Sequence, residues 1–221
     1  RVPAGSALAV DRDRFSAEIS DRISTHPLIT VRRELVKTIP TEGIALLAPG
    51  PLPATELENN LQTLIGTDHL AFYDAIAPIV DANSLDMSKL FYGSRWGKGD
   101  GDDYLNSPMT SEEYQVFLNA LLEADRYSGH VHEADLPHFS GCQPIEVIAL
   151  SGGDSLRFGP LKPVGLNPPD GSRPSAVVQF RMENINRSAF NLVGFQTRMT
   201  VGSQRQVFRL IPGLEKARFL R

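Results

Sequence analysis

The sequence predicts a mixed α/β protein, because it carries two different hydrophobic periodicities. Apolar residues recur at helical spacing in residues 11–26, 54–65 and 111–125, whereas residues 176–182 alternate apolar and polar side chains as a strand does. The sequence has no internal repeat and no regularly alternating strand–helix unit. At 221 residues it is long enough to bury a core, as one large domain or two small ones.

The first predicted helix covers residues 11–26. Phe15, Ile19 and Ile23 follow one another at intervals of four, which places them on one face of a helix. Pro27 ends the pattern, because a residue that precedes proline is disfavoured in helical geometry. The periodicity therefore predicts an amphipathic helix.

Strands are predicted on both sides of the second helix. Short apolar runs at residues 28–31 and 43–47 suit buried strands, and Leu57, Leu61 and Leu64 define the helix over 54–65. In the last third, residues 176–182 and 190–195 are expected to pair as strands across a polar link.

The clearest helix is predicted over residues 111–125. Thr110 and Glu113 have the spacing of a capping box, in which each side chain satisfies a backbone N–H of the other. An apolar stripe follows at helical spacing: Tyr114, Phe117, Leu118, Leu121 and Leu122. This helix is expected to cover a core.

The net charge of −4 is distributed unevenly along the chain. Residues 1–150 carry 11 basic and 22 acidic side chains, whereas residues 151–221 carry 11 basic and 4 acidic ones. A basic segment suits a polyanion such as RNA, although these side chains equally suit ion pairs with the acidic part. No run of about 20 apolar residues is present, and the single cysteine fits a reducing, cytoplasmic setting.

The only cysteine, Cys142, is the one credible covalent nucleophile. It lies in the segment Phe139-Ser-Gly-Cys142-Gln-Pro, near a second loop rich in proline and glycine over 157–166. Such loops hold backbone groups rigidly against a ligand, but a buried core cysteine beside a surface connection fits the same residues. If the segment were helical, His138 would lie one turn before Cys142 and lower the pKa of its thiol.

Two metal hypotheses are weaker. The set His130, His132, His138 and Cys142 offers soft ligands, but its spacing matches no familiar zinc pattern. The loop over 94–103, with three aspartates near its end, lacks the ligand spacing of a calcium loop and is expected to be flexible and solvated. No Gly-x-Gly-x-x-Gly or Walker-type loop is present.

At these residues the chain resembles the folate- and FAD-dependent tRNA uracil-5-methyltransferases, the TrmFO family. The resemblance rests on Gly141-Cys-Gln-Pro-Ile-Glu146 and Leu156-Arg-Phe-Gly-Pro-Leu-Lys-Pro-Val-Gly-Leu166. Further similar blocks follow the same order along the chain, at residues 2–12, 72–80, 191–197 and 211–215.

The resemblance implies a glutathione-reductase-like FAD flavoprotein with an inserted domain. Residues 1–53 would belong to the FAD-binding domain, 54–190 mainly to the insertion, and 191–221 would return to the FAD-binding domain. A glycine-rich FAD-binding segment is expected before Arg1, and a further part of the flavin domain after Arg221. The 221 residues alone are therefore expected to be inactive.

The resemblance also implies the reaction and its participants. A methylene group from 5,10-methylenetetrahydrofolate, reduced with FAD electrons that NAD(P)H supplies, becomes the methyl on the 5-carbon of a T-loop uridine in tRNA. Cys142 matches one of two functional cysteines of the family, as uracil nucleophile, base or flavin-protecting thiol. Val36, Ala48 and Gly50 match segments that line the FAD, with Pro49 in place of the usual threonine.

Three basic residues are the candidates for phosphate or folate-carboxylate contacts. Arg157, Lys162 and Arg173 are chosen on charge and position alone. The sequence also departs from the family pattern, at Trp96 and Gly97 in the loop over 94–98, at Ser107 where cysteine is usual, and at Arg218. Two alternatives stay open: a related FAD-dependent enzyme that modifies the wobble uridine of tRNA, and a non-catalytic RNA-binding module.

Overall fold

A five-stranded antiparallel sheet organises most of the chain in the computed structural model, which describes residues 1–5, 7–50, 53–65, 77–127 and 143–220. The strands lie in the order β1-β5-β4-β3-β2. Their bounds are β1 Ile79–Asp81, β2 Phe91–Tyr92, β3 Tyr104–Met109, β4 Ala176–Met182 and β5 Ala189–Leu192. The mixed α/β class predicted from the sequence is thus confirmed, with an antiparallel sheet.

The register pairs strands that are distant in sequence. In β3 and β4, Ser107 lies opposite Val178, and in β4 and β5, Phe180 lies opposite Leu192. The chain end also runs beside β1, because the Asp81 N–H donates to the Arg218 carbonyl at 2.9 Å. β4 therefore occupies the middle of the sheet.

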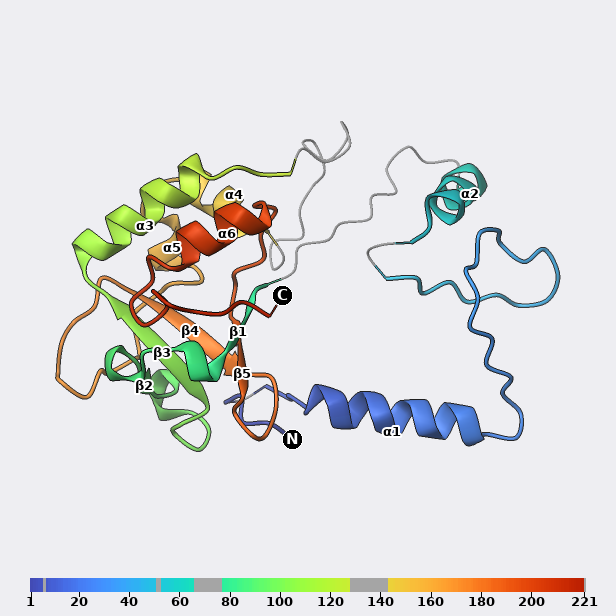
Figure 1. Cartoon of the computed structure of the whole chain (residues 1–221), viewed down its shortest axis with the longest axis horizontal. Coiled ribbons are helices and arrows are strands. Elements are labelled where there is room, and N and C mark those ends of the chain that lie inside the picture. The colour runs from blue at the N-terminus through green and yellow to red at the C-terminus, as the bar shows by residue number, and fades with distance from the viewer. Residues whose placement is uncertain (6, 51–52, 66–76, 128–142, 221) are drawn as a thin grey trace. The chain divides into compact units, whose positions relative to one another are not determined.

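Four helices gather on one side of this sheet (Figure 1). They are α3 Ser111–Glu123, α4 Ile145–Leu150, α5 Ser155–Phe158 and α6 Val201–Phe208. The predicted capping box of α3 is confirmed: Thr110 Oγ1 accepts from the Glu113 N–H, and Glu113 Oε2 accepts from the Thr110 N–H. Both groups satisfy backbone donors that a helix start would leave unpaired.

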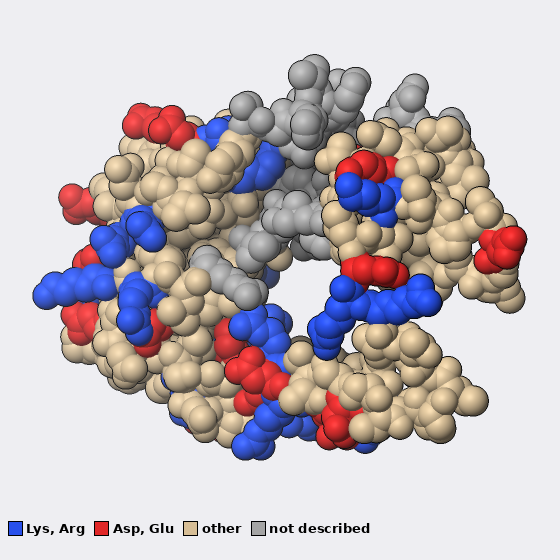
Figure 2. Space-filling view, turned by 45° about the vertical axis from the view of Figure 1, so that its right-hand side comes forward, with Lys and Arg blue, Asp and Glu red and all other residues tan. Residues whose placement is uncertain are grey.

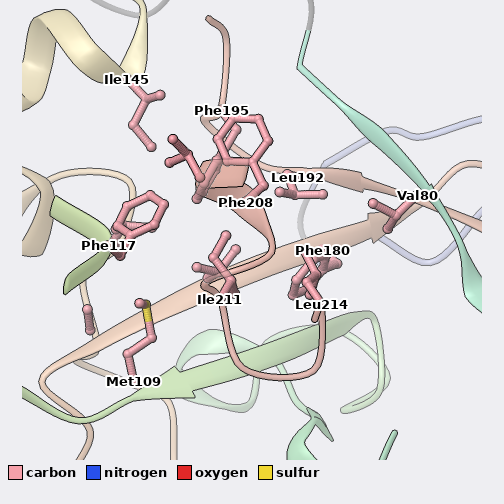
Figure 3. Close-up of a cluster of buried hydrophobic side chains, with 14 of the residues drawn as sticks. Val80, Met109, Phe117, Ile145, Phe180, Leu192, Phe195, Phe208, Ile211 and Leu214 are labelled. Atoms are coloured by element: carbon pink, nitrogen blue, oxygen red, sulfur yellow. The ribbon is translucent and has the colours of Figure 1, made fainter. Parts of the chain in front are cut away.

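The core lies between these helices and the sheet (Figure 3). Phe195 stands at its centre, with its ring centroid 6.1 Å from that of Phe117 on α3 and 5.4 Å from that of Phe208 on α6. Aromatic pairs at such distances add to the free energy of burial. Sheet residues complete the cluster, among them Val80, Met109, Phe180 and Leu192.

The alternation in β4 predicted one buried face, and the structure corrects this expectation. Val178, Phe180 and Met182 are buried as predicted, but Gln179 on the opposite face is buried too. A polar side chain can be buried at low cost only when it is hydrogen-bonded, and Gln179 has such partners.

By its internal contacts the chain divides into two compact units. The first comprises residues 1–19, 75–127 and 139–221 and holds the sheet, whereas the second comprises residues 20–74 and 128–138. The boundary expected at 190/191 falls inside β5. The assignment of residues 1–53, 54–190 and 191–221 to flavin and insertion domains stays a prediction.

Two predicted helices in the first 65 residues are confirmed. They are α1 Arg12–Thr25, which spans the boundary between the units, and α2 Thr55–Ile65 in the second unit. The apolar stripe of α1 is not buried among the described residues, because Phe15, Ile19 and Ile23 all remain exposed.

The buried strands predicted at 28–31 and 43–47 are wrong. Leu28, Ile44 and Leu46 are almost fully exposed, and both segments are irregular. A strand needs a neighbour to pair with its backbone, and no backbone–backbone hydrogen bond joins residues 30–50 to any other described residue.

Every helix that the structure describes is too short or too polar to cross a membrane.

Candidate functional site

Two segments that the sequence analysis singled out meet beside the 3₁₀ turn η3 (Arg95–Gly97). The Trp96 N–H donates to the Gly165 carbonyl at 2.8 Å, and the Arg95 guanidinium donates to the Val164 carbonyl, also at 2.8 Å. A cavity of about 370 Å³ opens where they join. Its lining comes from both segments and from β2, with Phe91, Gly93, Ser94, Trp96, Gly97, Gly101, Val164, Gly165, Leu166 and Asn167.

A buried network of hydrogen-bonded polar side chains holds this junction against the sheet. Arg95 Nε donates to Gln179 Oε1 at 2.9 Å, and Gln179 Nε2 donates to Asn106 Oδ1 at 3.1 Å. The Asn106 amide then donates to the carbonyls of Phe91 and Gly93, at 3.2 and 3.0 Å. Each buried group therefore has a partner, which makes such a network rigid.

Arg95 links η3 to β4 and to the loop over 157–166 through hydrogen bonds. Burial lowers the pKa of its guanidinium, but arginine keeps its charge at neutral pH. Its guanidinium donates to the Gln179 side chain of β4 and to the Val164 carbonyl in the loop over 157–166. The side chain thus connects the sheet to both walls of the cavity.

Trp96 stands at this junction in an unusual conformation. Its φ is 59°, in the left-handed region that costs a non-glycine residue about 1–2 kcal/mol. Its indole covers Gly165 so closely that a Cβ built there would lie 2.7 Å from Cε2 and 2.9 Å from Cδ2. The residue is nevertheless 67% exposed, so much of its aromatic surface remains open to solvent.

The aspartates near the end of the 94–103 loop organise that loop. Asp103 is buried, and its Oδ2 accepts from Ser94 Oγ and from the Asp100 N–H, both at 3.1 Å. Asp102 pairs with Arg187 at 2.6 Å, which raises the pKa of that guanidinium. The expectation of a flexible, solvated loop is therefore wrong for Asp103, because its carboxylate binds the loop together.

Within the residues that the structure describes, no three His, Cys, Asp or Glu side chains converge as a metal site would require. The histidines at 130, 132 and 138 lie outside the described residues.

The three basic candidates differ in whether their side chains already bind other groups of the protein. Arg157 is committed to its own loop: Nε donates to the Ser175 carbonyl at 3.0 Å, and the guanidinium pairs with Asp154 at 2.9 Å. Lys162 and Arg173 are exposed, and neither side chain has an ion pair or hydrogen bond among the described residues. The structure therefore leaves two of the three charges for a ligand.

The excess of basic residues after position 150 is partly neutralised by the acidic part of the chain. Besides the pair with Asp102, the Arg218 guanidinium binds Asp81. Figure 2 accordingly shows basic side chains interleaved with acidic ones on the face in view. The alternative that these arginines pair with the acidic part holds for Arg187 and Arg218.

Cys142 lies outside the described residues, so its surroundings stay a prediction. Four positions later, Glu146 is fully buried in the first turn of α4. One carboxylate oxygen accepts from the Arg198 N–H at 2.8 Å, whereas the other has no hydrogen-bond partner in the described structure. Sequence analysis missed this buried carboxylate, because a glutamate in a first helical turn is ordinarily exposed.

The expected flavin-lining residues Val36, Ala48 and Gly50 are not buried among the described residues. All three are exposed in the irregular part of the second unit. Gly50 has a φ of 74°, with no described atom within 4 Å of where its Cβ would stand.

Two departures from the family pattern have structural roles. Ser107 is fully buried and its Oγ donates to the Pro212 carbonyl at 2.7 Å, which ties β3 to the loop after α6. Asp81 accepts from the Asn83 N–H and from Arg218, and both contacts lower the pKa of its carboxyl. Local sequence patterns cannot predict the hydrogen bonds of Ser107 and Arg218, since their partners lie more than 100 residues away in the sequence.

The fold and the site define an α/β protein. Its buried polar network joins a proline- and glycine-rich loop to the sheet, beside exposed basic side chains. The family model described as "Glucose inhibited division protein A" matches residues 1–221, and the chain belongs to that family.

Curated relatives agree along the whole length of the chain. It is 54% identical over 222 residues to "Methylenetetrahydrofolate--tRNA-(uracil-5-)-methyltransferase TrmFO" of Geobacter sulfurreducens, covering 100% of this chain and 51% of that protein. The protein of the same name from Moorella thermoacetica is 50% identical, again over 100% of this chain and 50% of the relative. The chain thus spans about half the length of the curated relatives it matches, and the resemblance drawn from its motifs is confirmed.

Among solved structures, a chain of Aquifex aeolicus GidA aligns with a TM-score of 0.34 and 14% identity, over 66% of this chain and 22% of that chain. A similarity of that size carries no argument about function.

Proposed function

We propose that this chain is part of an enzyme that methylates the 5-carbon of a uridine in tRNA, with methylenetetrahydrofolate as the source of carbon. One observation carries the proposal: the chain is 50–54% identical, over its entire length, to relatives that bear this name. A T-loop uridine as target, FAD as the cofactor that supplies reducing chemistry, NAD(P)H as its reductant and a cytoplasmic location complete the proposal.

FAD is part of this proposal because of the family to which the chain belongs. The backbone around Val36, Ala48 and Gly50 is open and makes no backbone–backbone hydrogen bond among the described residues.

The role proposed for Cys142 follows from thiol chemistry. Addition of a thiolate to the 6-carbon of uracil makes the 5-carbon nucleophilic, and a base must then remove the 5-proton before the sulfur leaves. Cys142 is the only side chain in the sequence suited to that addition. As the alternative, the same thiol protects the flavin or moves the proton.

The proposed tRNA contacts rest on Lys162 and Arg173, which are exposed and have no side-chain partner in the described structure. Such cations bind phosphates, and removing one of them makes the binding of RNA less dependent on salt concentration. Arg157 is retained as a secondary contact, because its pairing with Asp154 leaves the guanidinium partly exposed.

The test measures transfer of labelled carbon from methylenetetrahydrofolate to tRNA in the native protein that contains this chain. Cys142→Ala should abolish transfer and leave tRNA affinity unchanged, whereas Lys162→Ala with Arg173→Ala should weaken tRNA binding and flatten its salt dependence. Unaltered turnover in Cys142→Ala would remove this residue from the chemistry. A protein that shifts tRNA in gels but shows no flavin absorbance and no transfer would establish the binding-module alternative.

A further inference from the structure

Trp96 combines two properties that a purely structural residue rarely has together. It is a large aromatic side chain left mostly in solvent, and its backbone is held in a conformation that disfavours any residue except glycine. Strain of this kind persists only where the surroundings impose it, and it concentrates at ligand sites.

The residues around Trp96 impose this backbone conformation. The Trp96 N–H is bonded to the Gly165 carbonyl, and the preceding residue is fixed to Gln179 and to the Val164 carbonyl. Gly165 itself has a φ of 87° and no side chain, so the indole lies directly on its backbone. The ring is therefore pre-positioned, and a ligand meets little entropic cost in ordering it.

The contact with Gly165 also shows how the ring is presented. The two atoms shared by both indole rings, Cε2 and Cδ2, lie almost equally close to the position of a Cβ at Gly165, at 2.7 and 2.9 Å. An approach centred on the ring junction is a contact with the face of the indole. Since the residue is 67% exposed, the opposite face is the one that remains open.

The cavity next to this ring suits a small planar ligand. Its volume of about 370 Å³ falls within the range of small-molecule sites. Gly93, Gly97 and Gly101 contribute backbone without side chains, which permits close approach. The exposed amide of Asn167 offers a donor and an acceptor, and it has no hydrogen-bond partner among the described residues.

The charges around the cavity favour a ligand that carries phosphate. Exposed Lys98 and Lys162 lie one and two positions from the lining residues Gly97 and Val164. Of the neighbouring carboxylates, Asp103 is buried and hydrogen-bonded and Asp102 is paired with Arg187, whereas Asp100, next to the lining residue Gly101, is exposed.

We propose that Trp96 is a stacking platform for an unpaired nucleobase of RNA, which inserts beside the indole while its phosphates contact Lys98 and Lys162. Stacking of bases on exposed aromatic side chains is the general means by which proteins hold single-stranded nucleic acid. The inference rests on the proposed function and extends it, because it assigns part of the RNA contact to Trp96, Lys98 and Lys162.

The chain contains one tryptophan, which makes its fluorescence a reporter of this site alone. A short oligouridylate should quench the emission of Trp96 saturably, whereas an abasic oligomer of equal length and charge should not. Equal quenching by both oligomers, or by neither, would overturn the proposal. Stronger quenching by folate alone than by the oligouridylate would also overturn it, in favour of a pterin.

Variants supply an independent test by fluorescence anisotropy of a dye-labelled oligouridylate. Trp96→Ala should weaken binding about 5- to 150-fold, and Trp96→Phe should restore most of the affinity. Phe158→Ala is the matched control, since Phe158 is an aromatic residue even more exposed than Trp96 and does not line the cavity. An unchanged affinity in Trp96→Ala, or an equal loss in Phe158→Ala, would refute the assignment.

The outcome is separable from that of the proposed methyl transfer. Cys142→Ala should show the same quenching as the unmodified chain, because the platform does not depend on the thiol. Base-dependent quenching in a protein without methyl transfer would support the platform and contradict the enzyme proposal. Methyl transfer without base-dependent quenching would support the enzyme proposal and contradict the platform.

Discussion

Replacement of Gly165 by alanine tests the junction between the two loops directly. The new Cβ would stand 2.7 Å from Cε2 of Trp96, whereas ordinary contacts begin at 3.4 Å, so the indole must move by several tenths of an ångström. The positive φ of 87° adds a backbone cost of about 1–2 kcal/mol, and the overpacked contact adds about 1–3 kcal/mol more.

Gly171→Ala is the matched control for this change. Gly171 has a similar φ of 73° but no atom within 4 Å of its would-be Cβ, so it carries the backbone cost without the collision. Urea unfolding followed by the fluorescence of Trp96 should show Gly165→Ala as the less stable of the two. For a chain of this length the difference corresponds to a melting temperature lower by about 2–4 °C per kcal/mol.

Acrylamide quenching of Trp96 provides the second measurement. Gly165→Ala should increase the accessibility of the indole, because the new methyl group pushes the ring away from the backbone, and Gly171→Ala should not change it. Equal unfolding free energies and equal quenching in the two variants would show that the indole does not rest on Gly165 and that Trp96 is not a fixed platform.

Three further predictions follow from the core, a buried hydrogen bond and an ion pair. Phe195→Ala should lower the free energy of unfolding by about 3–5 kcal/mol in urea titrations, because it empties the centre of the aromatic cluster. Ser107→Ala should cost about 1–3 kcal/mol by leaving a buried loop carbonyl unpaired, and a decrease below about 0.5 kcal/mol would contradict that bond. The Asn83 N–H and Arg218 lower the pKa of Asp81, so its contribution to stability is present above about pH 4 and is lost as the pH falls through the folded pKa. Unfolding of Asp81→Asn between about pH 2 and 6 should therefore depend less on pH than that of the unmodified chain, and equal slopes would exclude this role.

The elements that sequence predicts well are those whose signals are local. The α3 helix carries its own cap at Thr110 and an apolar stripe, and its observed bounds fall within two residues of the prediction. Strand β4 likewise has the bounds that its alternation predicts. By contrast, residues 28–31 and 43–47 are apolar enough for strands but have no described neighbour to pair with, and pairing is a property of the whole fold.

The candidate site is predictable in its parts but not in its assembly. Sequence analysis points to the loops over 94–103 and 157–166 separately, whereas the structure joins them through Arg95 and Gln179. Gln179 is expected on the polar face of a strand, and nothing in the alternation of β4 indicates that this face is covered. The buried network therefore depends on contacts between residues 84 apart, which no local pattern encodes.

The strand order has a consequence for how this protein is made. The first three strands, β1, β2 and β3, lie on the two flanks of the sheet, and only the late hairpin of β4 and β5 joins them. During synthesis on the ribosome, one side of Tyr104–Met109 stays unpaired until β4 has emerged at residue 182, and Ile79–Asp81 stays unpaired until β5 has emerged at residue 192. Pairing between such distant segments forms slowly, and until it forms the unpaired strand edges can bind other chains.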